Sequence, residues 1–194
     1  MMNGYDFSHW QTDDTIKMKL PGADFVIHKA TEGTTYKDPM LIPRCQWLFE
    51  NTPGIIYHYL RADKPNLDGE VNNFIGCYEK VKAKGYEVGL AVDVEYSSKT
   101  GGTKTSDLEY CKRFVSELIK KTGKRVIIYM PDTYGAEWYK WIREKDLGLW
   151  IARYRTKYPE HACDFWQFTS KPIDCDVFYG SEAKLFSFID GLAD

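Results

Sequence analysis

Two acidic residues two positions apart offer the clearest chemistry in this sequence. They are Asp93 and Glu95, at the end of the apolar run 89–95, Gly-Leu-Ala-Val-Asp-Val-Glu. Side chains alternate between the two faces of a β-strand, so both acids share a face with Ala91. Ionised acids avoid protein interiors, and packing alone explains such an inward-facing pair poorly. The alternative is an exposed loop, because Tyr-Ser-Ser follows at 96–98.

Two further aspartates can join this pair. Asp6 ends the Gly-Tyr-Asp segment of the first expected strand, and Asp174 begins the last expected strand. In a closed barrel these strands are neighbours, so the two aspartates could face Asp93 and Glu95 across one cleft. Crowded carboxylates raise one another's pKa and keep one acid protonated near neutral pH, as cleavage of a glycosidic bond requires. Taken singly, Asp6 and Asp174 would each be interpreted as a turn or cap residue.

Other reactive arrangements are weaker. The four histidines have no HExxH or HxH spacing, so we expect neither a metal site nor a cofactor. Cys45 and His58 could form a thiol hydrolase pair, but Cys45 lies in an apolar, helix-like segment and fits a buried, inert thiol better. His58, on the face opposite its tyrosine neighbours, fits a structural role. The five cysteines form no CxxC pair, which is typical of reduced thiols.

Composition places the chain among ordinary globular proteins. Its 194 residues are 43% hydrophobic and 28% charged, with a net charge of −2, and we expect one domain over 1–194. The sequence has no run of Lys and Arg residues of the kind that binds nucleic acid. No stretch reaches the ~18 apolar residues that span a bilayer. We therefore expect neither nucleic acid nor a membrane as a partner, and a monomeric domain.

Strand-like and helix-like segments alternate along the chain, which favours a mainly parallel sheet. The best helix is 106–122, with its apolar residues on one face and Gly123 after its last turn. A second helical stripe runs over 71–81, and 38–52 and 132–143 are weaker helix candidates. The expected strands are 4–10, 25–31, 54–60, 88–96, 125–130, 148–154, 164–169 and 173–178.

Eight such strands indicate an α/β fold, a short and irregular TIM-like (β/α) barrel. The chain is shorter than the roughly 250 residues typical of that fold. The shortage falls in the C-terminal third, where the connections are too short for helices, so we expect strands joined by loops and an incomplete barrel. Active sites in such barrels lie at the C-terminal ends of the strands, where Asp93 and Glu95 would lie.

Eight segments in series cover nearly the whole chain. They are GYDFSHWQ at 4–11, FVIHKATEGTTYKDP at 25–39, IIYHYLRA at 55–62, LAVDVEY at 90–96, RVIIYMP at 125–131, LWIARY at 149–154, FWQFTS at 165–170 and IDCDVFYG at 173–180. In this order they resemble glycoside hydrolase family 25, the lysozymes of fungi, bacteria and many bacteriophage endolysins. Each segment alone is weak, but the ordered series is specific.

The resemblance implies a lysozyme (N-acetylmuramidase) that hydrolyses the β-1,4 bond between N-acetylmuramic acid and N-acetylglucosamine in peptidoglycan. It makes Glu95 the general acid and Asp93 the partner that supports the reacting sugar. Asp6 and Asp174 carry over as the other acids of the cleft, and Asp176 falls where the family often has asparagine. The remaining matched cleft positions are Tyr57, Trp150, Tyr154 and Gln167.

The mechanism and the function class have alternatives. The short spacing of Asp93 and Glu95 favours retention assisted by the substrate's acetamide group, against direct attack by an aspartate or an inverting route. A non-catalytic peptidoglycan-binding module would not need all four acids. An amidase or peptidase acting on the stem peptide would need a zinc site or a Cys–His pair, and the sequence offers neither clearly.

A lysozyme acts outside the cell, on the bacterial wall, which it lyses or remodels. No signal peptide is recognisable, since residues 1–4 run directly into a strand-like segment. We therefore expect release by phage lysis or by a non-classical route, or else a leader that has been removed.

Overall fold

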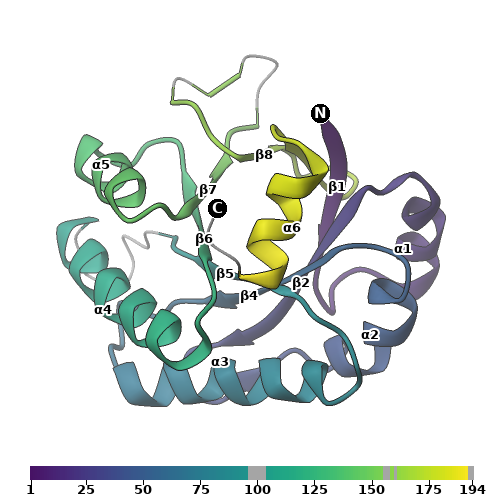
Figure 1. The fold of residues 1–194 in the computed structure, drawn as a ribbon, viewed down its shortest axis with the longest axis horizontal. Helices are drawn as coiled ribbons and strands as arrows, with labels where there is room; N and C mark the ends of the chain where they lie inside the picture. The colour runs from purple at the N-terminus through teal and green to yellow at the C-terminus, as the bar shows by residue number, and fades with distance from the viewer. Residues whose placement is uncertain (96–103, 155–157, 160, 192–194) are drawn as a thin grey trace.

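The computed structural model describes residues 1–95, 104–154, 158–159 and 161–191, with the backbone alone for 104–106. In this part of the chain the strands form a single sheet (Figure 1). All eight expected strands are present, and the short β3 is additional. Their bounds are β1 Met2–Phe7, β2 Phe25–Glu32, β3 Tyr36–Lys37, β4 Gly54–Tyr59, β5 Gly89–Asp93, β6 Val126–Pro131, β7 Gly148–Ala152, β8 Phe165–Thr169 and β9 Asp174–Phe178.

The sheet closes into a barrel of eight strands. Its order is β1-β9-β8-β7-β6-β5-β4-β2, and β1 pairs with β2 to complete the ring. Neighbouring strands are parallel except at β9, which runs antiparallel to both β8 and β1. The short, irregular α/β barrel predicted from the sequence is confirmed. The ring of strands is closed, so only the surrounding layer of helices is incomplete.

Helices surround the barrel on the side of β2 to β6 (Figure 1). Among the described residues none between β7 and β9 is helical, as the short connections predict. None of the described helices is long and apolar enough to cross a membrane. The α-helices are α1 Asp13–Lys19, α2 Leu41–Phe49, α3 Leu67–Lys82, α4 Lys104–Thr122, α5 Ala136–Glu144 and α6 Glu182–Asp190, with a 3₁₀ turn, η1, at Leu20–Gly22.

Two of these helices, α1 and α6, are absent from the sequence-based prediction. α1 buries a single residue, Ile16, and therefore has no apolar stripe to reveal it. α6 carries better signals: the Ser181 hydroxyl accepts a hydrogen bond from the Lys184 N–H, and Gly191 ends the helix with φ at 75°. The expectation of loops alone in the last third of the chain is wrong at α6.

Alternation along β5 divides its side chains between two cores. Leu90 and Val92 pack in the outer core with residues of the surrounding helices. Ala91 belongs to the inner core, within the barrel. Asp93 follows on the same inward face and ends the strand, which is shorter than the expected 88–96. Glu95 therefore lies in a loop just beyond the C-terminal end of β5.

α6 fills the opposite, N-terminal end of the barrel, and Figure 1 shows it in yellow across the ring of strands. Its Leu185 and Phe188 pack with Phe25 and Phe165, which begin β2 and β8. Gly148 permits this approach, because a Cβ atom there would lie 2.7 Å from the Phe188 ring. With one end of the barrel packed by apolar side chains, the other end is left for polar ones.

Candidate active site

A cavity of about 150 Å³ opens at the C-terminal ends of the barrel strands, away from α6. Its wall contains all eight residues that the sequence predicts for the site, and Tyr129 in addition. The lining residues are Asp6 of β1, Tyr57 of β4, Asp93 of β5, Glu95 just beyond it, Tyr129 of β6, Trp150 of β7, Tyr154 just beyond it, Gln167 of β8 and Asp174 of β9.

The four acids enter the cavity from opposite sides of the ring. Asp93 is 6% exposed, whereas Glu95 is exposed. Asp6 and Asp174 lie directly opposite each other in the antiparallel β1–β9 pair. One oxygen of Asp93, Oδ1, is buried and has no hydrogen-bond partner among the described residues. A donor on a bound substrate could satisfy this oxygen.

Loss of hydration to the surrounding protein is the largest cause of a raised pKa in each of these acids, including Glu95, part of whose side chain remains exposed. The charge of Glu95 further raises the pKa of Asp93, and that of Asp174 further raises the pKa of Asp6, to about 7. The pKa of Asp174 rises to about 6. The ammonium group of Lys29 lowers the pKa of both Asp93 and Glu95. The cluster therefore retains protons near neutral pH, as general acid catalysis requires.

Gln167 links the acids to the tyrosines of the cavity. Its Nε2 donates to Asp6 Oδ2 at 2.6 Å. Its Oε1 accepts from the hydroxyl groups of Tyr129 at 3.0 Å and Tyr154 at 2.8 Å. The side chain is 4% exposed, so these bonds are shielded from water. Gln167 thus fixes the orientation of Asp6 and of two aromatic side chains together.

Aromatic rings form the remaining wall of the cavity. Trp150 contacts Tyr129 edge-on, with ring centroids 4.5 Å apart, and Tyr57 at 6.4 Å in a similar geometry. The Trp150 indole N–H donates to Asp176 Oδ1 at 2.8 Å, below the cavity. Rings with a hydrogen-bonded polar edge and an apolar face suit the contact surfaces of a sugar.

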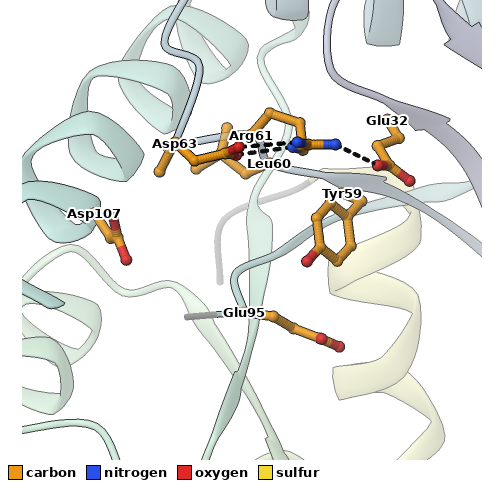
Figure 2. Close-up of a pocket in the computed structure, with 8 residues that line it drawn as sticks. Glu32, Tyr59, Leu60, Arg61, Asp63, Glu95 and Asp107 are labelled. Atoms are coloured by element: carbon orange, nitrogen blue, oxygen red, sulfur yellow. Dashed lines mark hydrogen bonds and ion pairs between the residues drawn. The ribbon is translucent and has the colours of Figure 1, made fainter. Parts of the chain in front are cut away.

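A second hollow, of about 230 Å³, also has Glu95 in its wall (Figure 2). Arg61 spans its upper rim, with its Nε 2.8 Å from Asp63 Oδ1 and its Nη1 3.0 Å from Glu32 Oε1. Tyr59 lies between this rim and Glu95. Glu95 lines both hollows. An acid in this position can reach a bond that joins one group in each of them.

Comparison with known proteins identifies the family of this chain. The family model "Glycosyl hydrolases family 25" matches residues 5–177. The chain belongs to this family. Protein YegX of Escherichia coli O6:H1, itself uncharacterised, is 26% identical over 216 residues, covering 100% of this chain and 75% of its own length. Lysozyme M1 of Streptomyces globisporus is 23% identical over 219 residues, covering 99% of this chain and 72% of its own.

A solved structure supports the family's fold for this chain. The muramidase from Trichobolus zukalii superposes with a TM-score of 0.77 and 25% sequence identity, over 99% of this chain and 100% of that one. The family 25 resemblance expected from the sequence is confirmed, and the protein is a glycoside hydrolase by family.

Three residues of this family 25 site were not predicted from the sequence. Tyr129 lies on the inward face of β6, two positions after the inner-core residue Ile127, and alternation could have revealed it. Asp176 lies two positions after Asp174 on the same face of β9, so alternation of side chains along the strand could have revealed it too. Lys29 was harder to find, because its effect on the acids depends on how β2 lies relative to β5 in the closed barrel.

His58 has the structural role expected from the sequence. It is fully buried, with Nδ1 2.8 Å from Thr31 Oγ1 and Nε2 2.9 Å from Glu70 Oε2. Burial lowers its pKa, so the ring is neutral at neutral pH. With both ring nitrogens engaged it cannot serve as a base for Cys45, which is a free, buried thiol. The thiol hydrolase alternative therefore has no support.

Proposed function

We propose that this protein is a lysozyme that hydrolyses the β-1,4 bond between N-acetylmuramic acid and N-acetylglucosamine in peptidoglycan, and that residues 1–194 form one catalytic domain. The observation that carries the proposal is the place of Glu95. It lines two hollows, one of which also contains Asp6, Asp93 and Asp174 at the C-terminal ends of the barrel strands. A glycosidic oxygen joining a sugar in each hollow would meet this carboxyl group. The muramidase and lysozyme relatives support the same substrate class.

Glu95 is the proposed general acid. Before substrate binds, Asp93 and Glu95 compete for protons, and the deeper burial of Asp93 favours the proton there. The acetamide N–H of a bound sugar would satisfy Asp93 Oδ1, which has no partner among the described residues. A hydrogen bond of this kind favours the ionised form of Asp93. Substrate binding would therefore favour protonation of Glu95, beside the bond to be broken.

Asp93 is the proposed partner in a retaining mechanism. The acetamide oxygen attacks C1 of the muramyl ring, the C1–oxygen bond breaks, and the leaving oxygen takes the proton of Glu95. The cyclic oxazolinium ion carries a positive charge, which ionised Asp93 stabilises. The Glu95 carboxylate then removes a proton from a water molecule that attacks C1, and the ring opens with retained configuration. Asp6 and Asp174 complete the acidic lining of the cavity.

Four side chains are the proposed sugar contacts: Tyr57, Trp150, Tyr154 and Gln167 all line the cavity. Two other routes to the same products are direct attack by an aspartate and inversion. The rival functions are a binding module, which would release no product, and an amidase, which would release free amino groups.

The bond cleaved is tested by mass spectrometry of digested bacterial peptidoglycan. We expect muropeptides with N-acetylmuramic acid at the reducing end. The bond breaks at C1 of the muramyl ring, and N-acetylglucosamine is the leaving group. Reduction with borohydride marks that end and identifies the sugar. Products with reducing N-acetylglucosamine would refute the bond assignment. New free amino groups without new reducing ends would favour the amidase.

The proposed place of action is the bacterial cell wall, outside the cytoplasm. Peptidoglycan is the proposed partner, and lysis or remodelling of the wall is the proposed outcome, as in a bacterial or phage endolysin-like lysozyme. The domain is proposed to act as a monomer.

A further inference from the structure

Asp176 of β9 is a buried acid beneath the cavity that the proposed mechanism does not use. Its side chain is 1% exposed. Oδ1 accepts a hydrogen bond from the Trp150 indole N–H at 2.8 Å. Oδ2 is buried, and among the described residues no donor reaches it. A carboxylate with an oxygen in this state would be strongly destabilised.

The groups around Asp176 offer no compensating positive charge. Across the β1–β9 pair it lies beside the strand of Asp6, and Asp174 precedes it by two residues on the same face. On its other side the register places it opposite Gln167 of β8. Trp150 approaches from β7. The described residues contain no ion pair to Asp176, so its charged neighbours are the two other acids.

We infer that Asp176 is a neutral carboxylic acid at neutral pH and that its Oδ2–H group donates a hydrogen bond to Asp6, which makes Asp176 a positioning residue for the acid cleft. The proton turns the unpartnered oxygen into a donor and removes a buried charge. It also explains how Asp6 and Asp176 can lie against each other in a site that holds three further acids, Asp93, Glu95 and Asp174.

The electrostatics of the pair agree. Burial and the charge of Asp6 hold the pKa of Asp176 well above its usual value. Hydrogen bonding between the two side chains raises the pKa of Asp176 further and lowers that of Asp6, as expected if protonated Asp176 is the donor. Asp6 lines the cavity and accepts the Gln167 amide as well, whereas Asp176 is more deeply buried. Asp176 therefore holds its proton more strongly, and Asp6 is the member of the pair that ionises first. Donors from β8 and β9 then fix the Asp6 carboxylate in the cleft.

Asp176→Asn tests the protonation state through stability. Asparagine reproduces a protonated aspartate, with an N–H group for Asp6 and an oxygen for Trp150, but it cannot ionise. An acid whose pKa is raised on folding costs stability as pH rises above its unfolded pKa of about 4, because only the unfolded chain can release that proton. The Tm of Asp176→Asn relative to wild type should therefore rise steadily from pH 4 to pH 8.

A matched control is Asp190→Asn, an exposed residue at the end of α6, whose Tm difference should not grow in this way. Infrared spectroscopy at pH 7 should also show the carbonyl stretch of a protonated carboxylic acid that Asp176→Asn loses. A Tm difference independent of pH, together with an unchanged infrared spectrum, would show that Asp176 is ionised and overturn the inference. Neither measurement depends on activity, so both test the protonation state of Asp176 whether or not the protein is a lysozyme. The role of Asp176 in positioning Asp6 rests on the proposed lysozyme function.

Positioning is tested by rescue. Asp176→Ala removes the donor to Asp6 and should lower kcat about 10-fold, as loss of one buried hydrogen bond would. Asp176→Asn, which restores the donor, should recover most of that loss. Equal activity of Asp176→Ala and wild type would show that Asp6 needs no such support. A folded Asp176→Asn enzyme as weak as Asp176→Ala would show that the proton itself is used, which contradicts a positioning role.

Discussion

At the scale of single residues, the site could be predicted because its members alternate along strands. Asp93 and Glu95 are two positions apart, and the structure places both at one cavity with Asp6 and Asp174. What the sequence could not show is which residues support them. The hydrogen bonds of Gln167 join β8 to β1 and β6, so they depend on the register of a closed barrel. Gln167, predicted as a sugar contact, therefore also holds Asp6 and Tyr129 in place.

Asp93→Asn should lower kcat strongly while leaving binding to cell walls intact. Its interaction with the substrate strengthens only as positive charge develops, so the loss falls on the transition state. Wall-binding assays and steady-state kinetics separate the two quantities. A thiazoline mimic of the cyclised intermediate should inhibit the wild type more strongly than the variant. A covalent sugar–aspartate adduct, or product with inverted configuration, would rule out the acetamide-assisted route.

Gln167→Leu should reduce kcat more than it changes KM. The substitution leaves Asp6 without its 2.6 Å amide donor and the hydroxyl groups of Tyr129 and Tyr154 without their acceptor. Loss of buried partners of this kind costs about 1–3 kcal/mol, which corresponds to roughly 5- to 150-fold if it falls entirely on the rate. Gln167→Glu, which keeps the acceptor but not the donor, is the matched comparison. If KM rises and kcat does not change, Gln167 is a sugar contact alone.

At the scale of elements, strands were predicted better than helices. Each expected strand exists, because alternating apolar residues face two separate cores. The predicted ends ran too far where polar residues continued the alternation, as at β5, which stops at Asp93. α6 was missed although Leu185, Phe188 and Ile189 have helical spacing. Its burial depends on the interior of the barrel, a surface that exists only once the strands have closed.

Phe188→Ala should destabilise the protein by about 3–5 kcal/mol, the usual cost of removing a buried aromatic side chain. Phe188 is fully buried and contacts Phe165 and Phe178, with ring centroids 5.7 Å and 6.4 Å away. Phe186 on the same helix is 38% exposed, so Phe186→Ala should change stability by roughly 0.5 kcal/mol or less. Urea unfolding measures both. Equal effects of the two variants would show that packing of α6 into the N-terminal end of the barrel does not stabilise the protein.

At the scale of the whole molecule, the barrel separates stability from chemistry. α6 and the apolar strand beginnings fill one end, and the acids and tyrosines occupy the other. The chain length predicted a barrel with a reduced shell of helices, and the short connections placed the reduction between β7 and β9. The closure of the ring through β1 and β2 follows from long-range pairing, which no local pattern in the sequence encodes.

The central claim is that Glu95 donates the proton that breaks the glycosidic bond, and the turnover of Glu95→Gln on purified peptidoglycan tests it most directly. Glutamine keeps the shape of the side chain and removes the acid, so the variant should have an unchanged Tm and lose at least ~10²-fold in rate. Glu144→Gln, on the exposed end of α5, should retain wild-type activity as the matched control. A folded Glu95→Gln enzyme that degrades peptidoglycan at close to the wild-type rate would contradict the account.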